Sequence, residues 1–315
     1  MPPRYRVLIT APYFLPVLEQ FRARLEAEGI EIVPLPVAER AGEEELIAVI
    51  GDIDGLICGD DQVTERVVAR AGRLKVVSKW GTGIDSIDRD ACTRRGITVA
   101  NTPDAFSLPV ADTVLGYTLA FLRRLPWLDR EMKAGEWRKS GGTTLAECTF
   151  GIVGVGRIGR QVAHRVAAFG GRLLGNDIVP IPPEVLGETG LESTGLEELL
   201  ASSDVVSLNC DLNPTSRGLI GARRLALMKP TAVLINTARG PVVEEVALIE
   251  ALTSGRLGGA ALDVFEEEPL PADSPLRRLD NVLLAPHNAN ASPTARSRVH
   301  ENTVVNLIRG LRARH

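Results

Sequence analysis

The sequence predicts an α/β protein of two doubly wound domains, each a parallel sheet with helices on both faces. Three observations support this fold class. Short apolar runs alternate with longer amphipathic stretches along most of the chain, as expected for strands and helices in turn. The 315 residues suffice for two domains of about 100 to 200 residues each. The proline-containing segment Asn101–Pro103 interrupts the alternation, so we expect a domain crossing there.

The first series of elements precedes this break. Short apolar runs predict strands at Val7–Ile9, Ile30–Val33, Gly55–Cys58, Leu74–Ser78 and Ile97–Ala100. Amphipathic stretches predict helices at Val17–Glu28, Glu43–Ile50, Thr64–Ala71 and Ile87–Arg95. Strands buried on both faces read as continuous apolar runs, so this sheet should be parallel.

The second series follows a long apolar helix expected at Pro109–Leu125. The first of its six expected strands opens at Thr149 and leads into a glycine-rich segment. The other five are Arg172–Asn176, Val205–Leu208, Ala232–Ile235, Gly259–Leu262 and Val282–Leu284. Three helices are expected between these strands. The first ends at Phe169, and the other two span Leu196–Ala201 and Val243–Ser254. A last helix, Ser292–Leu311, should return to the first domain. We therefore place the first domain at residues 1–102, completed by 288–315, and the second at 103–287.

The charge balance and the length of the apolar runs argue against several kinds of partner. Thirty-six Lys and Arg against 40 Asp and Glu give a net charge of -4, too balanced for strong attraction to nucleic acid. The run Val7–Ile9 is too short for the core of a signal peptide. No stretch reaches the roughly 18 apolar residues that a membrane span needs. We expect a soluble, cytoplasmic protein.

The cysteines and histidines give no sign of a metal site. Cys58, Cys92, Cys148 and Cys210 lie far apart without a CxxC pair, as expected of thiols in a reducing compartment. A zinc site would need clustered Cys or His ligands, and the chain has only four histidines. No metal cofactor is expected.

A glycine-rich segment indicates a dinucleotide site. Gly154, Gly156 and Gly159 form a GxGxxG motif directly after an apolar strand and at the start of a helix. The first glycine allows a tight turn, the second lets a pyrophosphate approach the backbone, and the third lets helix and strand pack closely. The amides of Arg157 and Ile158 would face the phosphates at the helix N-terminus.

Asp177 indicates which dinucleotide is bound. It stands at the end of the next strand, 18 residues after Gly159, where the adenosine ribose should lie. A carboxylate there accepts hydrogen bonds from both ribose hydroxyls but repels a 2'-phosphate. No Lys or Arg follows in residues 178–182 to relieve that repulsion. We therefore expect NAD rather than NADP.

Six short motifs occur in order along nearly the whole chain: Lys79–Asp85, Asn101–Pro103, Gly154–Gly159, Asn236–Gly240, Ala261–Pro269 and Pro286–His287. In these motifs the sequence resembles the NAD-dependent D-2-hydroxyacid dehydrogenases, a family that includes D-3-phosphoglycerate dehydrogenase, D-lactate dehydrogenase and glyoxylate/hydroxypyruvate reductase. The resemblance implies a Rossmann nucleotide-binding domain and a flavodoxin-like substrate domain.

The chemistry of this family needs a cation, an acid/base and a carboxylate, and the motifs supply one of each. Arg239 follows a buried strand, and its planar fork can hold a substrate carboxylate while polarising the carbonyl. His287 also follows a strand, whereas His164 and His300 lie on expected helices and His315 ends the chain. The resemblance makes Glu268 its partner, since a neighbouring anion favours the imidazolium form.

The resemblance assigns further residues to the cofactor and the substrate. Asp263 would accept a hydrogen bond from the nicotinamide carboxamide. The loop over the adenine would contain Cys210, Pro214 and Thr215, and the nicotinamide side would be lined by Thr237 and Ala238. The substrate carboxylate would be bound by amides of a loop in the first domain, which contains Lys79, Gly81, Thr82 and Gly83.

Some residues of the expected cleft depart from the family pattern. Asp104 replaces a glycine, and Trp80 fills a position that is commonly small. Lys79 either touches a second anionic group of the substrate or is solvated at a strand end. The identity of the 2-hydroxy acid, its C2 side chain included, does not follow from these residues. No room remains after residue 315 for the regulatory domain of many phosphoglycerate dehydrogenases, so control by serine is not expected.

The resemblance implies an enzyme that transfers hydride between NAD(H) and C2 of a small 2-oxo or 2-hydroxy acid. We expect it to be a homodimer in the cytoplasm. Two alternatives remain open. One is a scaffold that senses NAD with the dehydrogenase fold and acts by binding partners. The other is phosphite oxidation, which resembling enzymes perform with similar Arg, Glu, His and Lys residues.

Overall fold

The computed structural model describes residues 4–313, which form two compact units. Unit 1 comprises the chain up to Phe106 and again from Ser292, and unit 2 is Ser107–Ala291. Both divisions fall four residues beyond the boundaries that the sequence predicts. The Phe106 ring packs against Trp80, 5.9 Å between centroids, which keeps the first of these short segments in unit 1. Backbone amides of the second bond to Asp263, which keeps it in unit 2.

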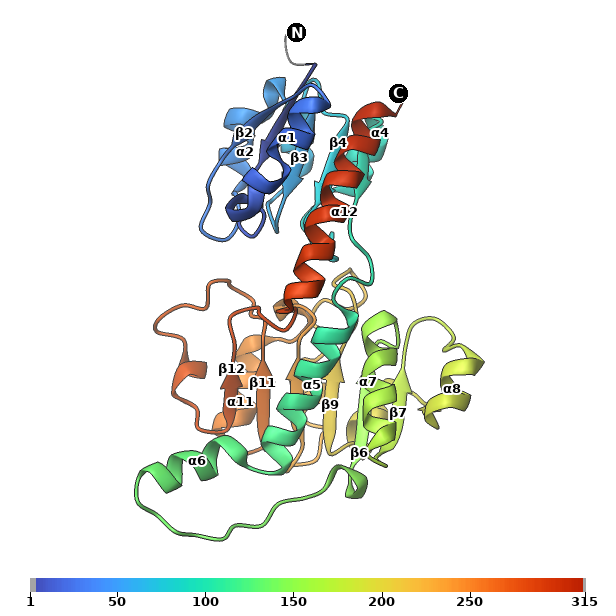
Figure 1. Cartoon of the computed structure of the whole chain (residues 1–315). Coiled ribbons are helices and arrows are strands. Elements are labelled where there is room, and N and C mark those ends of the chain that lie inside the picture. Colours follow the sequence, from blue (N-terminus) through green and yellow to red (C-terminus); the bar gives the residue numbers. More distant parts are fainter. Residues whose placement is uncertain (1–3, 314–315) are drawn as a thin grey trace. The chain divides into compact units, whose positions relative to one another are not determined.

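Unit 1 contains a sheet of five parallel strands in the order β2-β1-β3-β4-β5, the flavodoxin-like order (Figure 1). The strands are β1 (Tyr5–Ile9), β2 (Ile30–Pro34), β3 (Gly55–Cys58), β4 (Val76–Lys79) and β5 (Thr98–Ala100). Every residue of β3 and β4 is buried, as the continuous apolar runs indicate. All five predicted strands are present: β3 has the predicted bounds, and the other four differ from them by one or two residues at one or both ends.

The helices of unit 1 are α1 (Leu18–Ala27), α2 (Glu43–Val49), α3 (Glu65–Arg70), α4 (Arg89–Arg94) and α12 (Pro293–Arg312), with 3-10 turns at Leu15–Val17 and Ile50–Asp52. Side-chain caps fix several starts, since Asp88 accepts a hydrogen bond from the Ala91 amide at 2.8 Å. Figure 1 shows α12, in red, against the strands of unit 1. Gly310 allows this close packing, because a Cβ there would lie 2.4 Å from a Val76 methyl carbon.

Unit 2 contains a sheet of seven parallel strands in the order β12-β11-β10-β9-β6-β7-β8. The strands are β6 (Thr149–Val153), β7 (Arg172–Asn176), β8 (Glu192–Ser193), β9 (Val205–Leu208), β10 (Val233–Asn236), β11 (Gly259–Leu262) and β12 (Val282–Leu284). This is the Rossmann order extended by one strand. The predicted count of six is wrong because β8 consists of two exposed residues, which give no apolar run.

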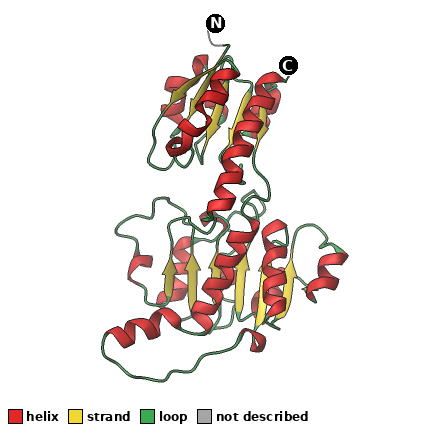
Figure 2. Ribbon diagram, viewed as in Figure 1, coloured by secondary structure: helices red, strands yellow, loops and turns green. Residues whose placement is uncertain are grey.

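The helices of unit 2 are α5 (Ser107–Leu122), α6 (Leu125–Lys133), α7 (Arg157–Ala168), α8 (Pro183–Thr189), α9 (Leu196–Ser202), α10 (Ala222–Leu225) and α11 (Glu245–Thr253), with 3-10 turns at Leu145–Glu147, Gly240–Val242 and Pro275–Arg278. Figure 2 shows the helices, in red, around the strands of each unit. The predicted helix Pro109–Leu125 ends early, because Arg124 adopts a φ of 54° and Leu125 begins a new helix. Within residues 4–313, no helix combines the length and apolarity that crossing a bilayer requires.

Candidate active site

The carboxyl ends of three adjacent strands in unit 2 carry the three residues expected to perform the chemistry. Strands β10, β11 and β12 are neighbours and run parallel, so their carboxyl ends lie on one edge of the sheet. Arg239 follows β10, Glu268 follows β11 and His287 follows β12. Ligands of doubly wound folds bind at this edge.

Glu268 and His287 form a hydrogen-bonded pair. The imidazole Nδ1 lies 2.8 Å from the Glu268 Oε2, and both side chains are about 30% exposed. The other carboxylate oxygen, Oε1, accepts a hydrogen bond from the Phe265 amide at 3.0 Å. Because the carboxylate is fixed through both oxygens, it orients the imidazole through Nδ1, and Nε2 is the ring nitrogen that would transfer a proton.

The turn that carries His287 is held by Asp263. His287 has a φ of 48°, a left-handed conformation that a non-glycine residue adopts only at a cost. The Asp263 carbonyl accepts a hydrogen bond from the His287 amide, and the two carboxylate oxygens accept one each from the Asn288 and Ala289 amides, all at 2.8 Å. Burial raises the pKa of Asp263, which is 1% exposed. Three consecutive amides therefore fix the backbone around the imidazole.

Asn236 shapes the turn that carries Arg239. Its side-chain amide donates to the Arg239 carbonyl at 3.0 Å, and its side-chain oxygen accepts from the Ala238 amide at 3.1 Å. The Arg239 guanidinium in turn donates from Nη1 to the Ala238 carbonyl at 2.8 Å. These bonds explain why an asparagine stands three residues before the arginine, a role that sequence reasoning did not assign.

Gly240 brings the Arg239 turn against the segment that leads to Glu268. A Cβ at this position would lie 1.9 Å from the Phe265 carbonyl carbon and 2.4 Å from the Glu266 nitrogen. Such distances exclude any side chain, so only glycine permits this approach of two backbones. The final glycine of the Asn236–Gly240 motif therefore has a packing function.

The glycine-rich turn after β6 has the geometry that its sequence predicts. Gly154 has a φ of 87°, and a Cβ there would lie 2.7 Å from the Cys210 nitrogen. A Cβ at Gly159 would lie 2.1 Å from the Gly154 carbonyl oxygen. At Gly156, by contrast, a Cβ would meet no atom within 4 Å. Protein packing thus explains two of the glycines, whereas the open space at Gly156 leaves room for a pyrophosphate to approach the backbone.

Asp177 directly follows β7 and clamps the glycine-rich turn. Its Oδ2 accepts a hydrogen bond from the Val155 amide at 2.7 Å, and its Oδ1 accepts from the Val179 amide at 3.1 Å. Each carboxylate oxygen has a second lone pair for a hydroxyl group. The residue that follows, Ile178, is 80% exposed and apolar. The Asp177 carboxylate can therefore accept hydrogen bonds from ribose hydroxyls. Residues 178–182 contain no Lys or Arg that could bind a 2'-phosphate.

The remaining residues expected around the cofactor also belong to unit 2. The backbone of Cys210 packs against Gly154, and burial raises the pKa of its thiol to about 11. Pro214 and Thr215 lie on the exposed loop after β9. The Thr237 hydroxyl, at the end of β10, is buried, and among the described residues it has no hydrogen-bond partner. An orphaned buried hydroxyl beside Arg239 fits a bound ligand at this edge.

Comparisons with known proteins agree with this geometry. Residues 115–289 match the model of the D-isomer specific 2-hydroxyacid dehydrogenase, NAD binding domain. This chain belongs to the D-2-hydroxyacid dehydrogenase family. Unit 2 contains the family's NAD-binding domain, and the open space at Gly156 and the acceptor at Asp177 fit that cofactor.

Relatives of the family differ in length and in the substrate that they are named for. A D-3-phosphoglycerate dehydrogenase of Methanocaldococcus jannaschii is 42% identical over 269 residues, 84% of this chain and 51% of the relative. The chain thus spans about half of that protein. A glyoxylate reductase of Thermofilum pendens is 43% identical over 272 residues, 84% of this chain and 80% of the relative.

A solved structure of the family is similar over nearly the whole chain. It is a D-lactate dehydrogenase of Aquifex aeolicus complexed with NAD and lactic acid, 28% identical with a TM-score of 0.86. The match covers 95% of this chain and 93% of that one.

Among residues 4–313 no group of His, Cys, Asp and Glu side chains could hold a metal ion.

In unit 1, the loop after β4 leaves its backbone amides available. The Gly81 carbonyl accepts hydrogen bonds from both the amide and the hydroxyl of Thr102, each at 2.9 Å. The Asn101 side chain donates to the Thr82 carbonyl at 2.5 Å. The amides of Gly81, Thr82 and Gly83 donate to no group in the described part of the chain. A loop with occupied carbonyls and unused amides has the donors that an anion needs.

Two departures from the family pattern gain a structural explanation. Lys79 is only 3% exposed, and its ammonium contacts Asp60 at 3.0 Å and the Trp80 carbonyl at 3.2 Å. The interpretation of Lys79 as a solvated strand-end residue is therefore wrong. Asp104 has a φ of 66°, the conformation that explains why relatives carry glycine there. Aspartate is among the few residues that adopt it readily.

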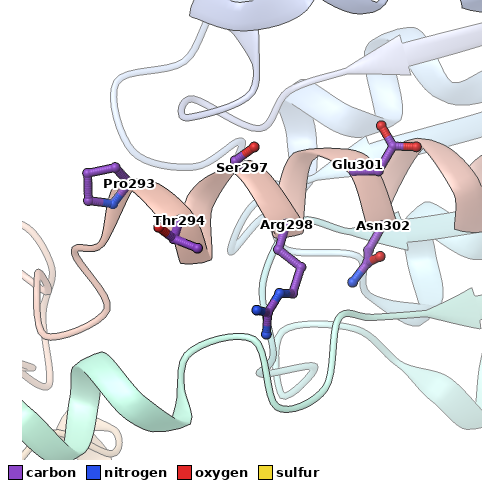
Figure 3. Close-up of a pocket in the computed structure, with 6 residues that line it drawn as sticks. All are labelled: Pro293, Thr294, Ser297, Arg298, Glu301 and Asn302. Carbon is purple, nitrogen blue, oxygen red and sulfur yellow. The ribbon is translucent and has the colours of Figure 1, made fainter.

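A hollow on α12 is less suited to bind a small molecule than the carboxyl edge of the unit 2 sheet (Figure 3). It is lined by Pro293, Thr294, Ser297, Arg298, Glu301 and Asn302. Figure 3 shows Arg298 and Asn302 on one side of the helix and Glu301 on the other. Glu301 is also paired with Arg24, at 2.5 Å. The polar groups of the hollow do not converge on one point, whereas those of a ligand pocket do.

Proposed function

We propose that the protein is an oxidoreductase that transfers hydride between NAD(H) and C2 of a small 2-oxo or 2-hydroxy acid. The observation that carries this proposal is the Glu268–His287 pair, 2.8 Å apart, at the carboxyl edge of the sheet that also carries the Arg239 turn. Glu268 follows β11 and His287 follows β12, and β11 lies next to β10, which leads into that turn. An oriented imidazole supplies the acid/base, and a guanidinium supplies the anion-binding group that this reaction needs. The relatives named for 2-hydroxy and 2-oxo acids support the same reaction class.

In this proposal Arg239 binds the substrate carboxylate. Its planar guanidinium can donate two parallel hydrogen bonds to a carboxylate. The same positive charge also polarises the adjacent C2 carbonyl. The Asn236 bonds to the Arg239 turn limit the positions that the guanidinium can reach, which lowers the entropy cost of binding.

His287 exchanges a proton with the C2 oxygen. During reduction, Nε2 donates its proton to the oxygen as negative charge develops there, and during oxidation the same nitrogen removes the proton from the hydroxyl group. Glu268 contacts Nδ1, so it fixes the ring and favours the charged imidazolium. Asp263 holds the backbone in the conformation that this pairing requires.

The nicotinamide cofactor, when bound, supplies or accepts the hydride. Gly154, Gly156 and Gly159, with the amides of Arg157 and Ile158, would hold its pyrophosphate. Asp177 would accept the hydroxyls of the adenosine ribose. Cys210, Pro214 and Thr215 would contact the adenine. Thr237, Ala238 and Asp263 would contact the nicotinamide side.

The amides of Gly81, Thr82 and Gly83 are our candidates for a second contact with the substrate carboxylate. Their lack of other partners within the described chain supports this role. Lys79 is buried beside this loop, where its ammonium is paired with Asp60 at 3.0 Å. In this proposal the ammonium contacts a second anionic group of the substrate, in exchange for Asp60 or together with it.

The activity is tested by following NADH oxidation with glyoxylate, pyruvate, hydroxypyruvate and 3-phosphohydroxypyruvate. We expect turnover of at least one of these acids, with NADPH a poorer reductant. Negligible turnover of all four despite tight NADH binding would support an NAD-sensing scaffold instead. Reduction of NAD by phosphite, measured in parallel, would support the phosphite alternative.

We further propose that the protein is a homodimer and uses α6 of unit 2 in the interface. Three large apolar side chains on or near this helix are exposed: Leu125 by 56%, Met132 by 51% and Trp137 by 80%. Apolar side chains grouped at the surface are typical of subunit contacts. Light scattering should give twice the mass of one chain, and Trp137→Glu should shift it toward one. Phe169→Glu, at an exposed apolar position elsewhere, serves as the control.

A cytoplasmic location is also proposed. All four cysteines are free thiols, three of them buried, as expected in a reducing compartment. The balanced charge of the chain favours small-molecule substrates over nucleic acid as partners. Cell fractionation with an antibody against the protein would test the location.

A further inference from the structure

A buried hydrogen bond joins the loop after β4 to the C-terminal helix of unit 1. The Trp80 indole Nε1 donates to the His300 Nδ1 at 3.0 Å. The two side chains are 5% and 9% exposed, so water does not offer the indole a substitute acceptor. The two residues are 220 positions apart in the chain. The bond therefore connects α12 with the loop that presents unused amides.

His300 is suited to act as the acceptor. Its ring lies 5.8 Å from Phe14, 6.5 Å from Phe21 and 5.6 Å from Trp80, centroid to centroid. Burial among these rings lowers the pKa of His300, and the positive charge of Arg296 lowers it further. The imidazole is thus neutral at physiological pH, with its proton on Nε2 and a lone pair on Nδ1 facing the indole.

Trp80 is itself part of the loop that it anchors. Its amide donates to the Cys58 carbonyl at 2.8 Å, and its carbonyl accepts from the Lys79 ammonium at 3.2 Å. Tyr13 stacks on the indole with 5.1 Å between ring centroids and 28° between planes. The next residue is Gly81, whose φ of 120° starts the turn. Fixing the indole therefore fixes the peptide units on both sides of it.

We propose that His300 is a positioning residue for substrate binding, because its hydrogen bond to Trp80 holds the amides of Gly81, Thr82 and Gly83 in an anion-binding arrangement. The inference rests on the proposed function of that loop. The other charged or titratable groups beside the pair, among the described residues, are few. Arg296 lies one turn before His300 on α12 and over the Tyr13 ring, at 5.3 Å. Lys79, the last residue of β4, is paired with Asp60 and donates to the Trp80 carbonyl.

Two isosteric substitutions separate the acceptor from simple packing. In His300→Asn, the Oδ1 occupies the place of Nδ1 and can accept the indole hydrogen, whereas His300→Leu has the same shape without an acceptor. We expect His300→Leu to raise the substrate KM about tenfold or more, because a buried donor loses its partner. The kcat and the NADH Kd should change less than about threefold. His300→Asn should recover most of the affinity for substrate. Equal KM values for the Leu and Asn variants would overturn the proposal.

A spectroscopic test of the contact does not depend on turnover. The emission of Trp80 is obtained by subtracting the Trp80→Phe spectrum, which removes the background of Trp127 and Trp137. Acid should protonate His300, break the bond and quench this emission in the wild type, and it should not do so in His300→Asn. An identical acid response in both proteins would show that the Trp80–His300 contact is not formed in solution and would overturn the inference.

Binding of oxalate to the NADH-loaded protein distinguishes this inference from the proposed function. Oxalate carries the carboxylate that the loop should bind but cannot be reduced. If no 2-oxo acid is turned over, the proposed function fails, and the oxalate Kd still decides the role of His300. We expect weaker oxalate binding in His300→Leu than in His300→Asn. Equal binding would contradict a positioning role.

Discussion

The Asp263 carbonyl accepts the His287 amide hydrogen at 2.8 Å, while the Asp263 carboxylate binds the next two amides at the same distance. One residue at the end of β11 thus determines the backbone of the turn after β12. Because His287 is left-handed, with φ of 48°, this turn would relax without such contacts. The imidazole that contacts Glu268 is therefore placed by a residue other than the three proposed to perform the chemistry, Arg239, Glu268 and His287.

Replacing Asp263 with asparagine should impair turnover through this turn. Asparagine offers one acceptor oxygen and one NH₂ group, which would face a backbone N–H and repel it. We expect kcat to fall about a hundredfold, since a displacement of about 1 Å at a reacting group has that effect. NADH affinity should fall much less. If NADH affinity falls as far as kcat, the main role of Asp263 is the contact with the nicotinamide carboxamide that the family resemblance implies.

Substitution of His287 by alanine should separate catalysis from cofactor binding. The imidazole is part of the proton-transfer pair, whereas the glycine-rich turn and Asp177 belong to other strands. We expect kcat to fall about 10²- to 10⁴-fold, the usual contribution of a general acid/base, with NADH affinity retained. Steady-state kinetics and NADH fluorescence titration measure the two quantities. Full activity of His287→Ala would refute the acid/base role.

The run of three glutamates shows what the sequence alone could and could not determine. Spacing within the family motif selects Glu268, and the structure places this residue 2.8 Å from the His287 ring. The neighbouring Glu266 instead pairs with Glu245 at the start of α11, where the amide of each residue donates to the carboxylate of the other. Three identical residues in a row give no periodic signal that distinguishes them. Only the motif register, set by Pro269, could make the choice.

The features that could not be predicted from the sequence are mainly contacts between residues far apart in the chain. The buried strands were recognisable because each is a continuous apolar run, and five of them have the predicted bounds to the residue. The Trp80–His300 bond joins residues 220 positions apart and leaves no local pattern. The hydrogen bonds from the amides of residues 288 and 289 to the Asp263 carboxylate are equally non-local. Such contacts depend on which loops meet at a sheet edge, and local periodicity does not encode that.

Asp177 should control the choice between NADH and NADPH. Its carboxylate is the group that a 2'-phosphate would meet, and it also binds the Val155 amide of the glycine-rich turn at 2.7 Å. Asp177→Ala should therefore weaken NADH binding about tenfold to a hundredfold, as expected for lost charge-assisted hydrogen bonds. Damage to the turn affects both cofactors equally, so the informative quantity is the ratio of their kcat/KM values. This ratio should move toward NADPH, and an unchanged ratio would contradict the assignment.

Two glycine substitutions test whether the open space at Gly156 belongs to the cofactor. A Cβ at Gly156 meets no protein atom within 4 Å, and the φ of -74° is compatible with alanine. Gly156→Ala should therefore leave the melting temperature of the free protein unchanged while weakening NADH binding, because the methyl group would occupy the position of the pyrophosphate.

The matched control for Gly156→Ala is Gly187→Ala, on α8, where a Cβ also meets nothing within 4 Å. Alanine favours a helix interior over glycine by about 0.5 to 1 kcal/mol, so this control should be slightly more stable and bind NADH normally. Thermal unfolding with and without NADH measures both effects, because a ligand raises the stability only of a protein that binds it. If NADH raises the melting temperature of Gly156→Ala as much as that of the control, the pyrophosphate does not lie over Gly156.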